Sequence, residues 1–232
     1  MKRQVKYHGT YKDNFGKTAI IIENNFKTLF TEIDGVEFSG SEFTSLIVSD
    51  IAKYTDDQLK RFTFFEIPIY NTDIVEQALC NCIFEVFISQ LIIDKTNFSE
   101  FYSDLKIEYS IGNPIPRGGL EFEKITLSIT IDGKNYTGTG DLIESAFDQI
   151  RDQFDDKYQF KNCYGCMFGD YSVFGQSSFG TMLCFVSQKD KYKKVTNKSE
   201  YMELPTEKIF CVQETYGCDK YEVRSKGAGY RG

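Results

Sequence analysis

Short apolar runs alternate with turn residues from residue 5 to residue 49 of the chain. The segments 27–33 and 36–39 stand on either side of Asp34-Gly35. Both central residues of a type I′ turn need a positive φ angle, which Asp and Gly tolerate, so this pair predicts a two-residue hairpin. The segments 125–131 and 134–139 repeat the arrangement around Asp132-Gly133. Both hairpins indicate antiparallel sheet.

Alternation also predicts two further strands. Residues 62–70 include Pro68, which has no N–H to donate to a ladder, so we expect this strand at an edge of its sheet or ending there. Cys80 and Cys82 begin a run with a period of two that continues through Phe84. This period places both sulfurs on one face of a strand, and we interpret these two cysteines as core packing.

One segment has helical spacing instead. Asp141 can act as an N-cap, and Glu144 stands three residues further on. We therefore predict a helix near residues 141–154 that covers a sheet with the residues that recur at helical spacing, which are Leu142, Ile143, Ala146, Phe147, Ile150 and Phe154.

The chain as a whole is predicted to be α+β and mainly β, with antiparallel, sandwich-like sheets and one covering helix. An aromatic fraction of 16%, from 21 Phe and 15 Tyr, suits sheet surfaces. Beyond Asp155-Asp156 the composition shifts toward Gly, Tyr, Phe, Ser and Cys, and residues 163–185 have few regular patterns. We expect a β-rich body over residues 1–158 and a loop-rich, cysteine-containing region over residues 159–232, packed together as one unit.

The cysteines of the last third of the chain form the main chemical pattern. Cys163 and Cys166 make a C-x2-C pair, a spacing that lets two thiolates at a tight turn reach one tetrahedral ion. Cys184 falls in a predicted strand, Cys218 follows a predicted turn, and Cys211 is left over in what looks like a buried strand. We predict a structural zinc site that staples the region, because four thiolates leave no coordination position for water or substrate. Its ligands are Cys163, Cys166, Cys184 and Cys218.

Other interpretations of these cysteines stay open. They are unligated thiols, iron–sulfur ligation, or a redox pair at Cys163 and Cys166. A three-cysteine site with Asp170 or Glu214 beside an open coordination position would instead indicate a metal-assisted hydrolase.

The net charge of the chain indicates which class of binding partner it favours. The chain carries 34 acidic and 27 basic side chains and a net charge of −7, which disfavours nucleic acid as a ligand and favours a basic protein. No apolar stretch follows the first residues as in an export signal, and residues 80–93 are too short to cross a bilayer. With seven cysteines expected to stay reduced, we predict a cytoplasmic protein that does not bind membranes.

No catalytic set is predicted. His8 is the only histidine, and we interpret it as an exposed strand residue. No phosphate-binding loop or dinucleotide fingerprint is present in the sequence.

The C-terminal motifs resemble those of a family of uncharacterised bacterial proteins of similar length. The motifs are Cys163-x2-Cys166, Asp170-Tyr171-Ser172 with Gly175, Gly180-x-Met182-x-Cys184-Phe185, Val212-Gln213-Glu214-Thr215-Tyr216-x-Cys218 and Gly229-Tyr230-Arg231-Gly232. The resemblance runs from about residue 105 to the end and more faintly back to Tyr11. It implies a bacterial origin and a functional grouping of the four cysteines, and it implies no activity.

These observations lead to a functional hypothesis. We expect a non-catalytic, protein-binding protein with a structural zinc site, of the kind that an immunity protein against a basic toxin would be. The alternative is a zinc- or thiol-dependent enzyme that uses the cysteine region, with Asp170, Ser172 and Glu214 near the metal. A zinc module that binds nucleic acid ranks third.

Overall fold

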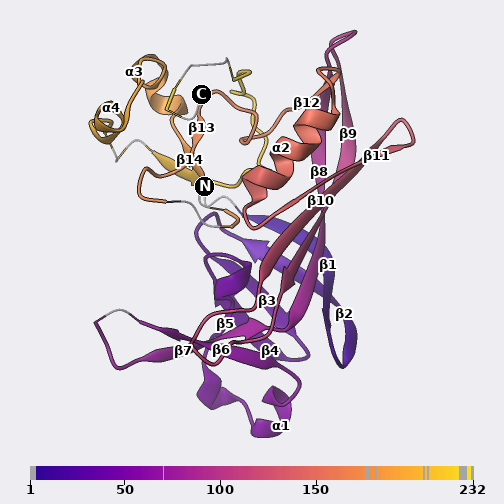
Figure 1. Ribbon diagram of the computed structural model, residues 1–232, viewed down its shortest axis with the longest axis vertical. Helices are drawn as coiled ribbons and strands as arrows, with labels where there is room; N and C mark the ends of the chain where they lie inside the picture. The colour runs from indigo at the N-terminus through magenta and orange to yellow at the C-terminus, as the bar shows by residue number, and fades with distance from the viewer. Residues whose placement is uncertain are drawn as a thin grey trace.

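One twelve-stranded antiparallel sheet runs through the chain from β1 to β12 (Figure 1). The computed structural model describes residues 4–69, 71–175, 178–180, 182–205, 207, 209–224 and 229–230. Neighbours in the sheet follow the order β11-β10-β9-β8-β1-β2-β3-β4-β5-β7-β6, and β12 pairs with β8. The strands are β1 (Val5–Asp13), β2 (Gly16–Asn24), β3 (Leu29–Ile33), β4 (Val36–Gly40), β5 (Ile47–Val48), β6 (Thr63–Pro68), β7 (Val75–Cys80), β8 (Cys82–Asp94), β9 (Ser99–Ile111), β10 (Glu123–Ile131), β11 (Lys134–Gly140) and β12 (Tyr158–Phe160).

The two predicted hairpin turns are confirmed. Asp34 and Gly35 join β3 to β4 with φ angles of 49° and 79°, and Asp132 and Gly133 join β10 to β11 with φ angles of 52° and 76°. These are the positive values that a type I′ turn requires.

The edge position of Pro68 is also confirmed, because β6 is the last strand of the sheet. Cys80 and Cys82 are both buried in the core, as predicted, but they belong to two strands instead of one. The chain turns between them at Asn81, whose φ angle is +51°, so Cys80 ends β7 and Cys82 begins β8.

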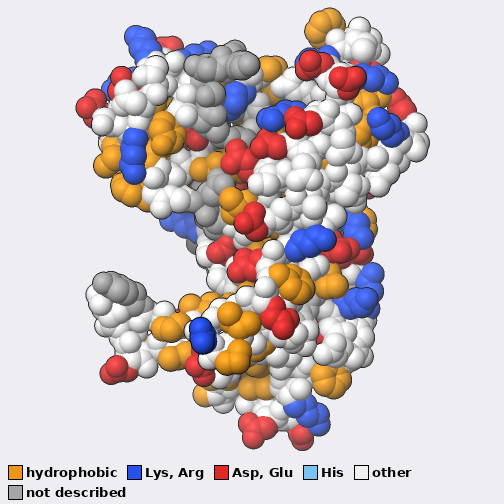
Figure 2. All heavy atoms as spheres, viewed as in Figure 1, with side chains coloured by type: hydrophobic (Ala, Val, Ile, Leu, Met, Phe, Trp, Pro, Cys, Tyr) orange, Lys and Arg blue, Asp and Glu red, His pale blue; other side chains and the backbone are white. Residues whose placement is uncertain are grey.

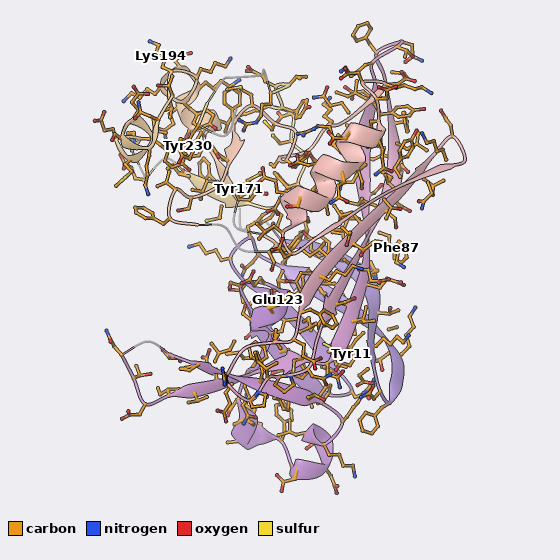
Figure 3. All side chains as sticks on the ribbon, in the orientation of Figure 1. Tyr11, Phe87, Glu123, Tyr171, Lys194 and Tyr230 are labelled. Carbon is orange, nitrogen blue, oxygen red and sulfur yellow. The ribbon has the colours of Figure 1, made fainter. Side chains whose placement is uncertain are left out.

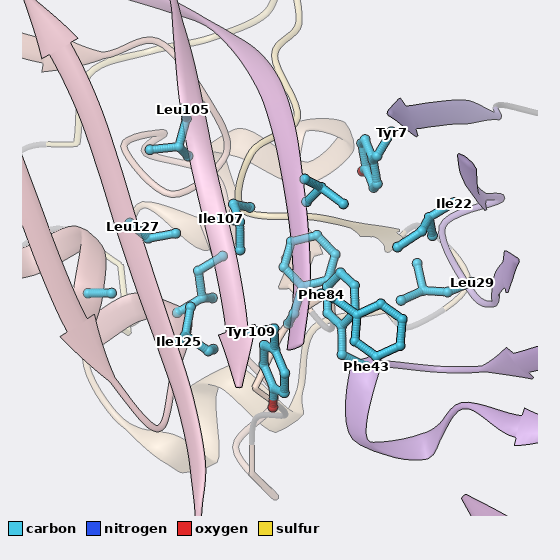
Figure 4. Close-up of a cluster of buried hydrophobic side chains, with 14 of the residues drawn as sticks. Tyr7, Ile22, Leu29, Phe43, Phe84, Leu105, Ile107, Tyr109, Ile125 and Leu127 are labelled. Carbon is cyan, nitrogen blue, oxygen red and sulfur yellow. The ribbon is translucent and has the colours of Figure 1, made fainter. Parts of the chain in front are cut away.

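The sequence predicted sandwich-like sheets, whereas the body contains one continuous twelve-stranded sheet whose buried side chains form one core (Figure 4). Phe43, in the short 3-10 helix η1 (Phe43–Ser45), is fully buried at the centre. Its ring stacks on Tyr109 of β9 at a centroid distance of 5.1 Å and contacts Phe84 of β8 at 5.4 Å. The connection after β4 therefore packs against the long strands of the other half of the sheet.

The predicted helix is present as α2 (Ile143–Gln153), which lies over β10 and β11 (Figure 1). Ile143, Ala146, Phe147 and Ile150 face the core, as the helical spacing indicates. The capping prediction is wrong by one residue, because the N-cap is Leu142, which has no side-chain oxygen, and not Asp141. Another helix of the body, α1 (Asp56–Leu59), is a single turn.

The region after β12 is loop-rich, as expected. It contains a small three-stranded antiparallel sheet of β13 (Gly169–Asp170), β14 (Met182–Cys184) and β15 (Phe210–Val212), with the short helices η3 (Val186–Gln188), α3 (Lys189–Tyr192) and α4 (Lys198–Met202) beside it. Tyr164 and Phe179 from this region are part of the core of the large sheet.

The mainly β, antiparallel character predicted from the sequence is therefore confirmed. Along the part of the chain that the structure describes, no helix combines the length and the apolar character needed to cross a membrane.

Candidate functional site

The C-x2-C pair forms a tight, buried turn. Cys163 and Cys166 are both buried, and the Cys166 N–H donates to the Cys163 carbonyl at 3.2 Å. The Gly169 N–H then donates to the Cys166 carbonyl at 3.2 Å. The backbone thus folds around the two thiols, as the spacing predicts.

Gly169 allows β13 to approach this turn closely. A Cβ atom at this position would lie 2.2 Å from the Cys163 carbonyl oxygen, well inside van der Waals contact. In the small sheet, Gly169 pairs with Cys184 of β14, so the same close approach places Cys184 opposite the turn.

The fourth cysteine is brought in by a separate hydrogen bond. The Cys163 N–H donates to the carbonyl of Tyr216 at 2.7 Å, and Cys218 lies two residues further along the chain. Cys163 itself packs in a small buried cluster with Tyr171, Met182 and Val212, on the side of the molecule where Figure 3 labels Tyr171.

The other cysteines of the predicted set act on the thiol of Cys163. Burial raises the pKa of this thiol above its ordinary value, and Cys166, Cys184 and Cys218 each raise that pKa further. An ionised Cys163 is therefore disfavoured by burial first and by the other three cysteines next.

The structure does not support a metal staple as part of the fold. Among the residues that it describes, no three or more His, Cys, Asp or Glu side chains stand in an arrangement that could hold a metal ion. Zinc ligation by these residues stays a prediction.

The two carboxylates of the predicted three-cysteine alternative are both buried, but their surroundings differ. Asp170 accepts hydrogen bonds from the Tyr192 hydroxyl and from the Tyr171 N–H, the latter at 2.7 Å. Glu214 accepts from the Gly180 N–H at 3.1 Å, and its charge contributes to the raised pKa of Cys163. Glu214 is therefore the carboxylate that lies close enough to the thiols to act on them.

A strap formed by residues 222–224 crosses the C-x2-C turn. The Met167 N–H donates to the Glu222 carbonyl at 2.7 Å, and the Arg224 guanidinium donates to the carbonyls of Cys166, at 3.1 Å, and Gly169. Sequence patterns gave no signal for this strap, because it depends on backbone carbonyls that any residue provides.

Lysines of α3 and its C-terminal end hold the strap in place. Lys189 and Lys193 bind the Glu222 carboxylate at 2.5 and 2.8 Å, and both ammonium groups lie over the Phe168 ring. The sequence did not predict the role of these lysines, because a run of lysines that binds a carboxylate cannot be distinguished in the sequence from a run of lysines in an exposed loop.

Two grooves open near the cysteine region. One, of about 410 Å³, is lined by Cys218, Gln90, Tyr102, Lys161 and Asp219, among others. A second, of about 580 Å³, lies between α2 and the strap, and Figure 2 shows acidic and basic side chains together on this part of the surface.

The remaining cysteine and the histidine lie apart from these grooves. Cys211 is exposed on β15, so its predicted burial is wrong: β15 is an edge strand of the small sheet, and one face of Cys211 meets solvent. His8 is exposed on β1, between Ile21 of β2 and Phe87 of β8, as expected of a strand residue.

The fold and site together define a mainly β protein with a large antiparallel sheet and a buried C-x2-C turn. The chain belongs to a family of unknown function (DUF6304), whose model matches residues 5–169. The predicted membership of an uncharacterised family is thus confirmed, and the match includes Cys163 and Cys166 but ends before Cys184 and Cys218. Searches of curated proteins and of solved structures find no match to this chain.

Proposed function

We propose that this chain is a non-catalytic, protein-binding protein whose C-terminal region is held by one structural zinc ion. The ligands are Cys163, Cys166, Cys184 and Cys218. The observation that supports the proposal is that the thiol of Cys163 is buried beside the C-x2-C turn and that Cys166, Cys184 and Cys218, from three separate parts of the chain, all raise its pKa.

Electrostatics explain why a cation suits this place. The pKa of Cys163 is raised first by burial and then by three further cysteines and Glu214. Each of these effects disfavours the thiolate form of Cys163. A divalent cation reverses this balance, because it stabilises several neighbouring thiolates at once. Zinc is the ion that four thiolates select most often in proteins, and binding would draw the sulfurs to about 2.3 Å from the metal.

The protein-binding part of the proposal is supported by the surface. The net charge of −7 suits a basic partner, and aromatic side chains are enriched in protein interfaces. Phe98, Phe174 and Phe15 are 82%, 80% and 71% exposed, and each lies at a turn. An immunity-type inhibitor that acts on a basic toxin in the cytoplasm would use an acidic surface with protruding aromatic residues of this kind.

The metal is tested by elemental analysis of protein purified without a metal-binding tag. We expect about one zinc per chain in the wild type and in Cys211→Ser, which removes an exposed cysteine, and loss of most of the zinc in Cys163→Ser. Wild-type protein that stays free of zinc after purification from zinc-supplemented cells contradicts the metal site.

The partner is tested by affinity purification from the native cell. We expect a basic protein to co-purify, and its binding to weaken as ionic strength rises. Recovery of no protein above background, from cells at several growth stages, contradicts the binding function.

A zinc- or thiol-dependent enzyme is the second candidate, favoured by the 410 Å³ groove beside Cys218 and by the closeness of Glu214 to the thiols. X-ray absorption at the zinc edge separates the two functions. Four sulfur neighbours support the structural site, whereas three sulfurs and one oxygen indicate an open catalytic position.

A further inference from the structure

One edge of the large sheet is closed by side chains of the covering helix. The sheet ends at β11, and the edge of an antiparallel sheet presents unpaired N–H and C=O groups. Gln153 donates from Nε2 to the Thr137 carbonyl at 2.6 Å and accepts from the Thr137 N–H at 3.3 Å. Gln149 makes the same two bonds with Thr139, at 2.6 and 3.2 Å.

Each glutamine amide therefore copies the pattern of a neighbouring strand. In an antiparallel pair, one residue exchanges both of its backbone hydrogen bonds with the residue opposite, and a carboxamide carries the same donor and acceptor. The Gln153 amide also donates to the Gln149 carbonyl at 2.9 Å, which fixes its orientation.

The residue spacings of helix α2 and strand β11 allow both glutamines to reach the strand. Residues four apart in a helix are separated by about 6 Å along its axis, and residues two apart in a strand are separated by about 6.8 Å. Gln149 and Gln153 on α2 can therefore meet Thr139 and Thr137 on β11, with the helix running antiparallel to the strand.

A glycine permits the helix to come close enough. A Cβ atom on Gly138, which lies between the two threonines, would stand 1.9 Å from the Ala146 carbonyl oxygen. Only a residue without a side chain fits there, and the close contact brings both glutamine amides within reach of the β11 backbone.

We infer that Gln149 and Gln153 keep this edge from pairing with β11 of a second copy of the chain. The strand is suited to such pairing, because β11 runs from Lys134 to Gly140 and Thr137 is its centre. With Thr137 of each copy opposite the other, Asn135 faces Thr139 and Lys134 faces Gly140, so no like charges meet. The outward N–H and C=O groups of Thr137 and Thr139, which now bind the glutamines, would then form about six hydrogen bonds between copies together with those of Asn135.

The test replaces the amides but keeps the size and helix preference of the side chains. In Gln149→Met/Gln153→Met, light scattering after size exclusion should show a mass that rises toward two chains with concentration, beyond any rise in the wild type. Asp152→Ala is the matched control, because Asp152 is on the same helix and its exposed side chain pairs with Arg151, not with β11.

A further variant tests the register. Adding Thr137→Lys to the double variant places two lysines opposite each other, and like charges directly opposite are destabilising, so the mass should return to the wild-type value. A double variant that keeps the wild-type mass at every concentration overturns the inference, and so does a mass gain that Thr137→Lys leaves in place.

Hydrogen exchange of the wild type adds a test that needs no variant. The N–H groups of Thr137 and Thr139 should exchange at least tenfold more slowly than exposed amides, because the glutamines hold them. Exchange at the rate of exposed amides overturns the inference even if a variant fails to fold.

Discussion

Replacement of Gly169 by alanine tests how closely β13 must approach the Cys163 turn. The added Cβ atom would lie 2.2 Å from the Cys163 carbonyl oxygen and 3.0 Å from the sulfur of Met182. Since an ordinary contact begins near 3.4 Å, the atom stands about 1 Å too close to a backbone oxygen that cannot rotate away. The backbone itself must move.

The expected cost follows from this overlap. Overpacking of a well-packed site costs typically 1–3 kcal/mol, and a forced backbone shift puts Gly169→Ala at the upper end, about 3 kcal/mol of unfolding free energy. Gly217→Ala is a matched control in the same region. Its Cβ atom would meet the Lys161 carbonyl oxygen at 3.4 Å, so its stability should stay within about 0.5 kcal/mol of the wild type.

The assay is urea unfolding followed by far-ultraviolet circular dichroism and by tyrosine fluorescence, since the chain has 15 Tyr and no Trp. With a urea dependence near 3 kcal/mol per molar, Gly169→Ala should lower the midpoint by about 1 M. Equal midpoints for the two variants would refute the reasoning, because they differ mainly in the contact that the added methyl group meets.

Two further predictions concern the body of the protein. Phe43→Ala should lower the unfolding free energy by about 3–5 kcal/mol, because it empties the centre of the core, whereas Phe15→Ala, at a 71% exposed position, should change it by less than about 0.5 kcal/mol in the same urea assay. The pKa of Glu85 is lowered first by Lys106 and then by Lys17, with N–O distances of 2.6 and 3.3 Å. A lowered pKa gives stability that is present above the ordinary Glu value and lost as pH falls. Glu85→Gln should therefore cost about 1 kcal/mol at pH 7, and this cost should shrink as the pH falls below the ordinary Glu pKa of about 4.3 and vanish once the pH is below the lowered pKa. A cost that does not change over this range contradicts the reasoning.

The local features of the fold could be predicted because neighbouring residues determine them. Asp34-Gly35 and Asp132-Gly133 specify turns through their tolerance of positive φ, and Pro68 specifies an edge because it lacks an N–H. The burial of Cys211 was predicted wrongly because it does not depend on neighbouring residues in the sequence. Burial of a strand residue depends on which strand or solvent lies beside it, and the residues around Cys211 do not encode that.

For the candidate site, too, the sequence predicted local features but not those that depend on distances in the folded chain. The C-x2-C spacing predicted a turn at Cys163 and Cys166, and the structure has this turn, whereas the grouping of Cys184 and Cys218 with them stays a prediction. Ligation of a metal was not decided by the pattern, because it requires sulfur positions to within a few tenths of an ångström. Spacing in the sequence specifies residue types and order, not distances of that precision.

The sequence alone therefore determined the two Asp-Gly hairpins, the edge strand at Pro68 and the covering helix α2, all of which depend on side-chain chemistry and short spacing. The tertiary structure decided that Arg224 crosses the C-x2-C turn and that Gln149 and Gln153 close the edge at β11. In these contacts a side chain binds backbone N–H or C=O groups of a distant segment. Because every residue but proline offers both groups, no pattern of residue types marks the partner, and only the folded chain selects it.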